Sequence, residues 1–139
     1  MKKIVSIFTF FIFFVIVYSA QRQTDWQKDK LKGKVKEWTT IDYRIEEKFG
    51  ENVKKVVKKE GKKYNSLGNL LEEAKYNPDG TLSNKELYKY DVNGNAVEYM
   101  SYNSAGSVSS KAFYKNDAQG NMLEAIFYDE AGKLREKRF

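Results

Sequence analysis

The groups in this sequence with the most chemical potential are three regularly spaced glutamates, Glu72, Glu98 and Glu124. Paired carboxylates can serve as acid and base in glycoside hydrolysis when they face each other across a cleft. The regular spacing predicts instead that the three carboxylates occupy equivalent positions of a repeated structure. We interpret them as surface groups that pair with lysines, and no motif in the chain argues for an enzyme.

The composition also bears on metal chemistry, because the sequence contains no histidine and no cysteine. This removes the commonest general base and the preferred ligands of zinc and copper. The segment 91–95, Asp-Val-Asn-Gly-Asn, is similar to the start of an acidic calcium loop, but it lacks the length and the terminal glutamate of an EF-hand. We interpret it as a turn and expect neither a metal nor a cofactor.

Tyrosines supply the most promising ligand-binding feature. A ladder of rings can stack on sugars, whereas cross-strand aromatic packing alone would stabilise a sheet by about 0.2–1 kcal/mol per pair. Rings that line a solvent-filled groove would favour the first interpretation, and rings buried between layers would favour the second. The candidate ligand contacts are Tyr76, Tyr88, Tyr102, Tyr114 and Tyr128.

The densest charge lies in the segment 54–63, which is rich in lysine. It suits either an anionic surface, such as phospholipid headgroups or acidic polysaccharide, or the solvated face of an edge strand, where lysine blocks aggregation. We favour the edge strand. The formal charge of +6 falls to +4 without Lys2 and Lys3. This modest, interspersed charge argues against a nucleic-acid partner.

Turns must position all of these residues, and glycines mark them. Six of the nine glycines are the fourth residue of a turn that begins with Asn or Asp, whose side chain can accept a backbone hydrogen bond. In the fourth place glycine suits a type I turn followed by a G1 bulge, a common hairpin connection. The turn glycines form two series with a 26-residue period: Gly68, Gly94 and Gly120, and Gly80, Gly106 and Gly132.

The segments between these turns have strand length and are rich in Tyr, Phe, Val and Leu. They predict an all-β fold, an antiparallel meander of tandem β-hairpins in a single twisted or coiled repeat sheet. Residues 71 and 76 differ in parity, so we expect two apolar stripes on opposite faces. Counting outward from the turns predicts the pairs Tyr76–Leu82, Tyr102–Val108, Tyr128–Leu134, Leu71–Leu87, Val97–Phe113, Leu123–Phe139 and Glu73–Lys85.

The chain divides into three parts. Residues 1–20 read as a signal peptide, with a basic start, an apolar run and a small-residue cleavage site after Ala20; a retained membrane anchor is the alternative. Residues 21–63 form a lead-in and a divergent β cap, with a helix across 44–59 as the alternative, and residues 64–139 form the hairpin array. We therefore expect an exported protein, periplasmic, outer-surface or secreted, with no membrane span after cleavage.

The turn motifs resemble known repeats. Residues 90–95, Tyr-Asp-Val-Asn-Gly-Asn, resemble the signature of the YD (RHS-type) repeat, and residues 64–69 are a close variant, whereas Asn116 replaces the tyrosine in the third copy. Residues 76–82 and 128–134 look like variant MORN repeats. The resemblance covers 64–139, and the layout is similar to that of small exported proteins of Bacteroidetes-like bacteria. It implies an interaction scaffold without catalytic residues.

Two hypotheses for function follow. The first is a non-enzymatic binding or interaction module for a protein or cell-envelope partner. The second is carbohydrate binding, to cell-wall glycan or glucan, through the aromatic hairpin repeats.

Overall fold

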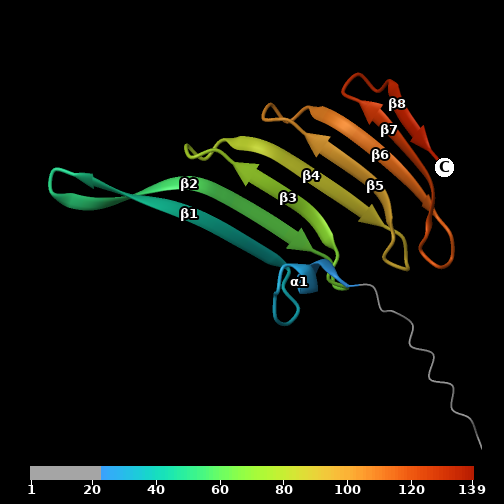
Figure 1. The fold of residues 1–139 in the computed structure, drawn as a ribbon, viewed down its shortest axis with the longest axis horizontal. Helices are drawn as coiled ribbons and strands as arrows, with labels where there is room; N and C mark the ends of the chain where they lie inside the picture. Colours follow the sequence, from blue (N-terminus) through green and yellow to red (C-terminus); the bar gives the residue numbers. More distant parts are fainter. Residues whose placement is uncertain (1–22) are drawn as a thin grey trace, which may run out of the picture.

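A computed structural model describes residues 23–139, so the predicted signal peptide lies outside the described part of the chain. The eight strands form one open antiparallel sheet in sequence order, which confirms the predicted all-β meander (Figure 1). The helical alternative for residues 44–59 is wrong, because these residues belong to the first two strands and the hairpin turn that joins them. The elements are α1 (Asp25–Lys28), β1 (Glu37–Lys48), β2 (Glu51–Tyr64), β3 (Leu70–Tyr76), β4 (Leu82–Tyr90), β5 (Ala96–Tyr102), β6 (Val108–Asn116), β7 (Met122–Asp129) and β8 (Leu134–Arg138).

The predicted turn chemistry is present. All six turn glycines have positive φ angles, and the Asp91 carboxylate accepts hydrogen bonds from the backbone N–H groups of Asn93 (2.9 Å) and Asn95 (2.8 Å). The first side chain accepts the equivalent bond two residues on in five of the six turns. The exception is Asn77, whose amide donates instead to Thr81 Oγ1 (3.0 Å).

The three pairs predicted directly beside a turn are correct, and the pairs predicted farther from the turns are wrong. Tyr76 pairs with Leu82 as expected, but the next pair is Lys75 with Asn84, because Ser83 is an extra residue in its strand. The same irregularity recurs after every turn glycine, at Leu71, Ser83, Val97, Ser109, Leu123 and Arg135. A bulge of this kind shifts all later pairs by one residue. Leu87 therefore opposes Glu72 instead of Leu71, and Lys85 opposes Ala74 instead of Glu73. Phe113 opposes Glu98 instead of Val97. Phe139 lies beyond the last pair of β7 and β8.

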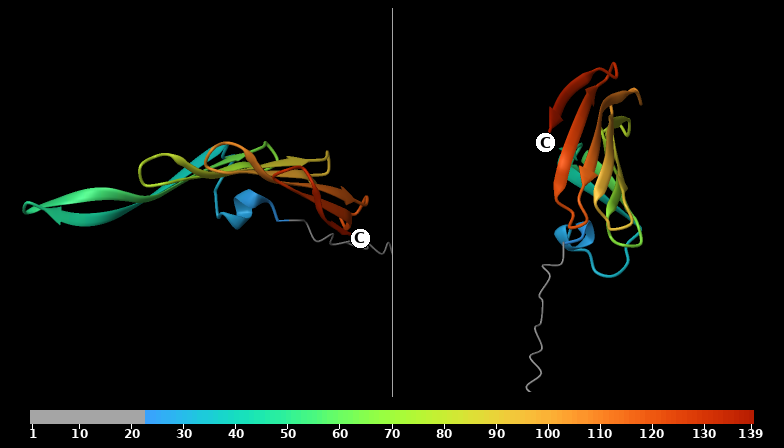
Figure 2. Two further views of the ribbon diagram at one scale, coloured as in Figure 1. Left: turned by 90° about the horizontal axis from the view of Figure 1, so that it is seen from above. Right: turned by 90° about the vertical axis from the view of Figure 1, so that its right-hand side faces the viewer.

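This shift also changes the faces of the sheet. Leu87 and Phe113 lie on the same face as Tyr76 and Tyr102, so the expectation that the two apolar stripes lie on opposite faces is wrong. We call this face convex, because the sheet curls away from it toward the side that holds α1, which we call concave (Figure 2). No large side chain in residues 23–139 is fully buried, and both faces of this single layer remain partly open to solvent.

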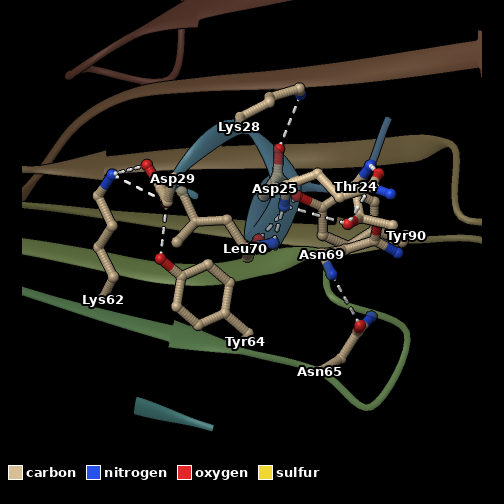
Figure 3. Close-up of polar contacts among 11 residues, drawn as sticks. Thr24, Asp25, Lys28, Asp29, Lys62, Tyr64, Asn65, Asn69, Leu70 and Tyr90 are labelled. Atoms are coloured by element: carbon tan, nitrogen blue, oxygen red, sulfur yellow. Dashed lines mark hydrogen bonds and ion pairs between the residues drawn. The ribbon is translucent and has the colours of Figure 1, made fainter. Parts of the chain in front are cut away.

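Residues 23–36, which precede β1, cover only a corner of the concave face. The Asp29 carboxylate accepts hydrogen bonds from the Tyr64 hydroxyl (2.6 Å) and from Lys62 Nζ (3.0 Å), and Asp25 accepts one from the backbone N–H of Leu70 (2.8 Å; Figure 3). Trp26 Nε1 donates to the Val35 carbonyl (2.7 Å). These bonds fix α1 against the ends of β2 and β3, and no other part of residues 23–139 covers the sheet.

The turns at the α1 end of the strands stack on one another. A Cβ on Gly120 would lie 2.7 Å from Asn95 Oδ1, and a Cβ on Gly94 would lie 3.3 Å from Asn69 Nδ2. The Trp26 ring occupies the corresponding place over Gly68. A second series of contacts has the same period, since the Tyr90 hydroxyl donates to the Leu70 carbonyl (2.7 Å) and the Asn116 amide to the Ala96 carbonyl (2.9 Å). Asn116 thus makes the equivalent backbone contact to that of the tyrosine it replaces.

The first hairpin extends past its neighbours. The pairing of β2 with β3 begins at Lys59, so residues 42–58 have no strand beside them and project from the sheet as a two-stranded ribbon (Figure 1). We call residues 42–58 the finger.

Candidate functional site

The structure places the five candidate tyrosines on two faces. Tyr76, Tyr102 and Tyr128 lie on the convex face, whereas Tyr88 and Tyr114 lie on the concave face. The five rings therefore do not form one ladder and cannot contact one ligand together. None of them lies between two layers, since the sheet is single.

On the concave face, Tyr88 and Tyr114 each contact an aromatic ring of the next strand. Tyr88 of β4 pairs with Tyr99 of β5, with ring centroids 5.3 Å apart, and Tyr114 of β6 meets Phe127 of β7 edge to face at 6.2 Å. Together the four rings form an aromatic track across β4 to β7, and we call these four residues the concave track.

Small residues make room between these rings. Ala112 pairs with both Tyr99 and Phe127, and Ala125 pairs with Tyr114; both alanines are buried beneath their neighbours. A hollow of about 300 Å³ opens here, where the sheet curls between β5 and β8. Its lining includes Tyr99, Ser110, Ala112, Tyr114, Phe127 and Arg138.

The far wall of the hollow is charged. The Arg138 guanidinium lies 5.0 Å from the centroid of the Phe127 ring, and its Nε donates to Glu136 Oε1 (2.6 Å). The hollow therefore offers ring faces on one side and a planar cation with its carboxylate on the other. This combination can hold a flexible molecule that has apolar ring faces and many hydroxyl groups.

The hydroxyls of the track remain protonated near neutral pH. Burial and a 2.6 Å hydrogen bond to Glu86 raise the pKa of Tyr88 well above its usual range, and burial raises the pKa of Tyr99 and of Tyr114. A protonated phenol both donates and accepts hydrogen bonds. The track can thus bond to neutral polar groups, and these hydroxyls are unsuited to act as bases.

The glutamate column has the role that its spacing predicts. Glu72, Glu98 and Glu124 lie on the convex face, away from the concave track, and each pairs with a lysine. The distances are 2.9 Å from Lys63 to Glu72, 2.8 Å from Lys89 to Glu98 and 2.6 Å from Lys137 to Glu124. These carboxylates are ion-pair partners of a repeated surface.

Sequence reasoning missed three residues of the concave site, Tyr99, Phe127 and Arg138. They were missed because they break the repeat: the residues 26 positions before them are Glu73, Ser101 and Ala112. On the convex face the columns repeat, as in Tyr76, Tyr102 and Tyr128. The departure of these positions from the 26-residue period was the signal available in the sequence.

Among residues 23–139 no group of three or more acidic side chains is arranged to hold a metal ion. No helix in the same part of the chain is both long and apolar enough to cross a membrane. No protein-family model matches the sequence, and no curated protein matches it either.

Proposed function

We propose that this protein is a non-enzymatic, exported binding module that holds a glycan of the cell envelope on its concave face. The observation that carries the proposal is the concave track, four half-buried rings, three of which (Tyr99, Tyr114 and Phe127) line a hollow of about 300 Å³. Aromatic rings that keep one face toward solvent pack against the apolar faces of sugar rings.

The shape and chemistry of the site support an extended ligand. The track crosses four strands, and no loop in the described residues closes over it, so a chain longer than the hollow can continue beyond it at either end. Ser110, Arg138 and the protonated tyrosines supply donors for hydroxyl groups. The resemblance of the turns to YD and MORN repeats agrees with a scaffold role, and the signal peptide predicted at 1–20 agrees with export.

A protein partner is the second candidate, and one observation on the convex face favours it. A hollow of about 480 Å³ is lined there by Val108, Phe113 and Tyr128, with Val108 and Phe113 exposed. A pocket of this kind suits an apolar anchor side chain from another protein.

Two variants of β5 separate the candidates. Tyr99 lies on the concave face and Tyr102 on the convex face, so Tyr99→Ala and Tyr102→Ala remove the same side chain from opposite sides of one strand. On a glycan array, we expect saturable binding by the chain without residues 1–20, loss of about tenfold or more in Tyr99→Ala, and little change in Tyr102→Ala. Equal losses in both variants, or no glycan bound by the parent protein, would reject the glycan proposal.

A further inference from the structure

The finger ends in an aromatic residue that the turn does not favour. Phe49 and Gly50 form its two-residue tip, with φ angles of +53° and +80°. Such a turn requires positive φ at both positions and prefers Asn, Asp or Gly at the first. A bulky aromatic residue in this conformation is unusual, and the Phe49 side chain is fully exposed. The tip thus retains a large apolar group that contributes no packing within the described chain.

The rest of the finger is amphipathic. Tyr43, Ile45 and Val56 lie on its convex side, where Tyr43 and Ile45 are half-exposed. The other side holds mainly charged residues, including the cross-strand neighbours Arg44 and Lys55. The convex side also holds Glu47, Asn52 and Lys54, and Lys54 Nζ lies 5.9 Å from the centroid of the Tyr43 ring. This side is therefore the more apolar of the two, and it continues into the convex face of the sheet.

The convex face is basic. Across β2 to β8 its repeated columns bring seven lysines to this face against three glutamates. Two of the lysines lie over tyrosine rings, Lys59 at 5.1 Å from the Tyr76 centroid and Lys85 at 4.9 Å from the Tyr102 centroid. The lysines are Lys59, Lys63, Lys85, Lys89, Lys111, Lys115 and Lys137, and the glutamates are Glu72, Glu98 and Glu124.

We propose that the convex face binds the surface of a bilayer that contains anionic phospholipid, with Phe49 inserted among the acyl chains. The lysine columns complement the negative headgroups, and tyrosine with lysine suits the region between headgroups and hydrocarbon. A fluid bilayer has no shaped pocket, and insertion of the protruding Phe49 side chain does not require one. The concave track then faces away from the bilayer, so the lipid and glycan surfaces do not compete.

Vesicle sedimentation tests this proposal. With vesicles of phosphatidylethanolamine and phosphatidylglycerol, we expect the chain without residues 1–20 to bind and Phe49→Asn to bind at least about tenfold more weakly. Asn suits the turn better than Phe, so this loss cannot come from unfolding. The control is Val92→Asn, because Val92 is also almost fully exposed in a turn, at 94%, but lies in the β4–β5 connection, outside the finger; we expect no change.

A second pair of variants tests the lysine columns. Lys85→Gln on the convex face should weaken binding about fivefold at low salt, whereas Lys75→Gln on the concave face should not change it. Vesicles of phosphatidylcholine alone should bind the parent protein more weakly, and Phe49→Asn should bind glycan as the parent does.

Three results would overturn the lipid proposal. They are no sedimentation of the parent protein at low salt, equal losses in Phe49→Asn and Val92→Asn, and self-association without vesicles that Phe49→Asn abolishes. The last result would assign the tip to a second copy of the chain.

Discussion

Alanine at two of the turn glycines should destabilise the protein to different extents. Gly120 and Gly132 have similar backbone conformations, with φ of +86° and +74°. Alanine in this left-handed region costs about 1–2 kcal/mol at either position. The surroundings differ, because nothing lies within 4 Å of a Cβ on Gly132, whereas a Cβ on Gly120 would meet Asn95 Oδ1 at 2.7 Å.

Asn95 cannot easily move away from a new methyl group. Its side chain is buried, and its Nδ2 donates to Asp91 Oδ2 (3.0 Å), a bond that rotation of the amide would break. Overpacking of this kind costs about 1–3 kcal/mol. We therefore expect Gly120→Ala to be less stable than Gly132→Ala by about 1–3 kcal/mol, or roughly 4–12 °C in Tm. Thermal and urea unfolding followed by circular dichroism measures this difference, and equal midpoints would refute the stacking of turns through Asn95.

Three further predictions concern other parts of the chain. Phe49→Asn should raise the free energy of unfolding by about 1 kcal/mol, because Asn tolerates the left-handed conformation better, and the midpoint of urea unfolding measures it. Trp26→Ala should lower the free energy of unfolding by about 3 kcal/mol, since it removes the ring over Gly68 and the bond to the Val35 carbonyl, and α1 should become susceptible to proteolysis. Hydrogen bonds from Asn95 lower the pKa of Asp91, so the stability that this carboxylate contributes is complete above its ordinary pKa of 3.8 and is lost as the pH falls below it. Urea midpoints measured from about pH 6 down to about pH 3 should therefore fall at the acid end, and a midpoint independent of pH would contradict the role of this turn.

The turns were predictable because their chemistry is local. An Asx residue, a glycine three positions later and the fixed period determine each hairpin without reference to the rest of the chain. The extra residue that follows each turn glycine and shifts the strand register was not predictable in the same way. The residues at the bulge, such as Leu71, Ser83 and Arg135, share neither size nor polarity, so the irregularity follows from the geometry of the hairpin and leaves no mark in composition.

The candidate site was predicted only in part. Tyr88 and Tyr114 were found because they repeat, and they do lie together on the concave face with the rest of the track. Tyr99 and Phe127 could not be identified from the 26-residue period, because the equivalent positions of the preceding copy hold Glu73 and Ser101. The curvature that gathers these rings arises from twist summed over eight strands, which no single segment encodes.

Amide chemical shifts test whether the concave track is the ligand-binding surface. An oligosaccharide that binds on the glycan array is added to the isotopically labelled chain without residues 1–20, and perturbed amides are mapped onto the sheet. We expect the shifts to concentrate around Tyr88, Tyr99, Tyr114 and Phe127 and to spare the amides of the finger. Shifts concentrated around Phe113 and Tyr128 near the convex hollow, with the track unperturbed, would contradict it.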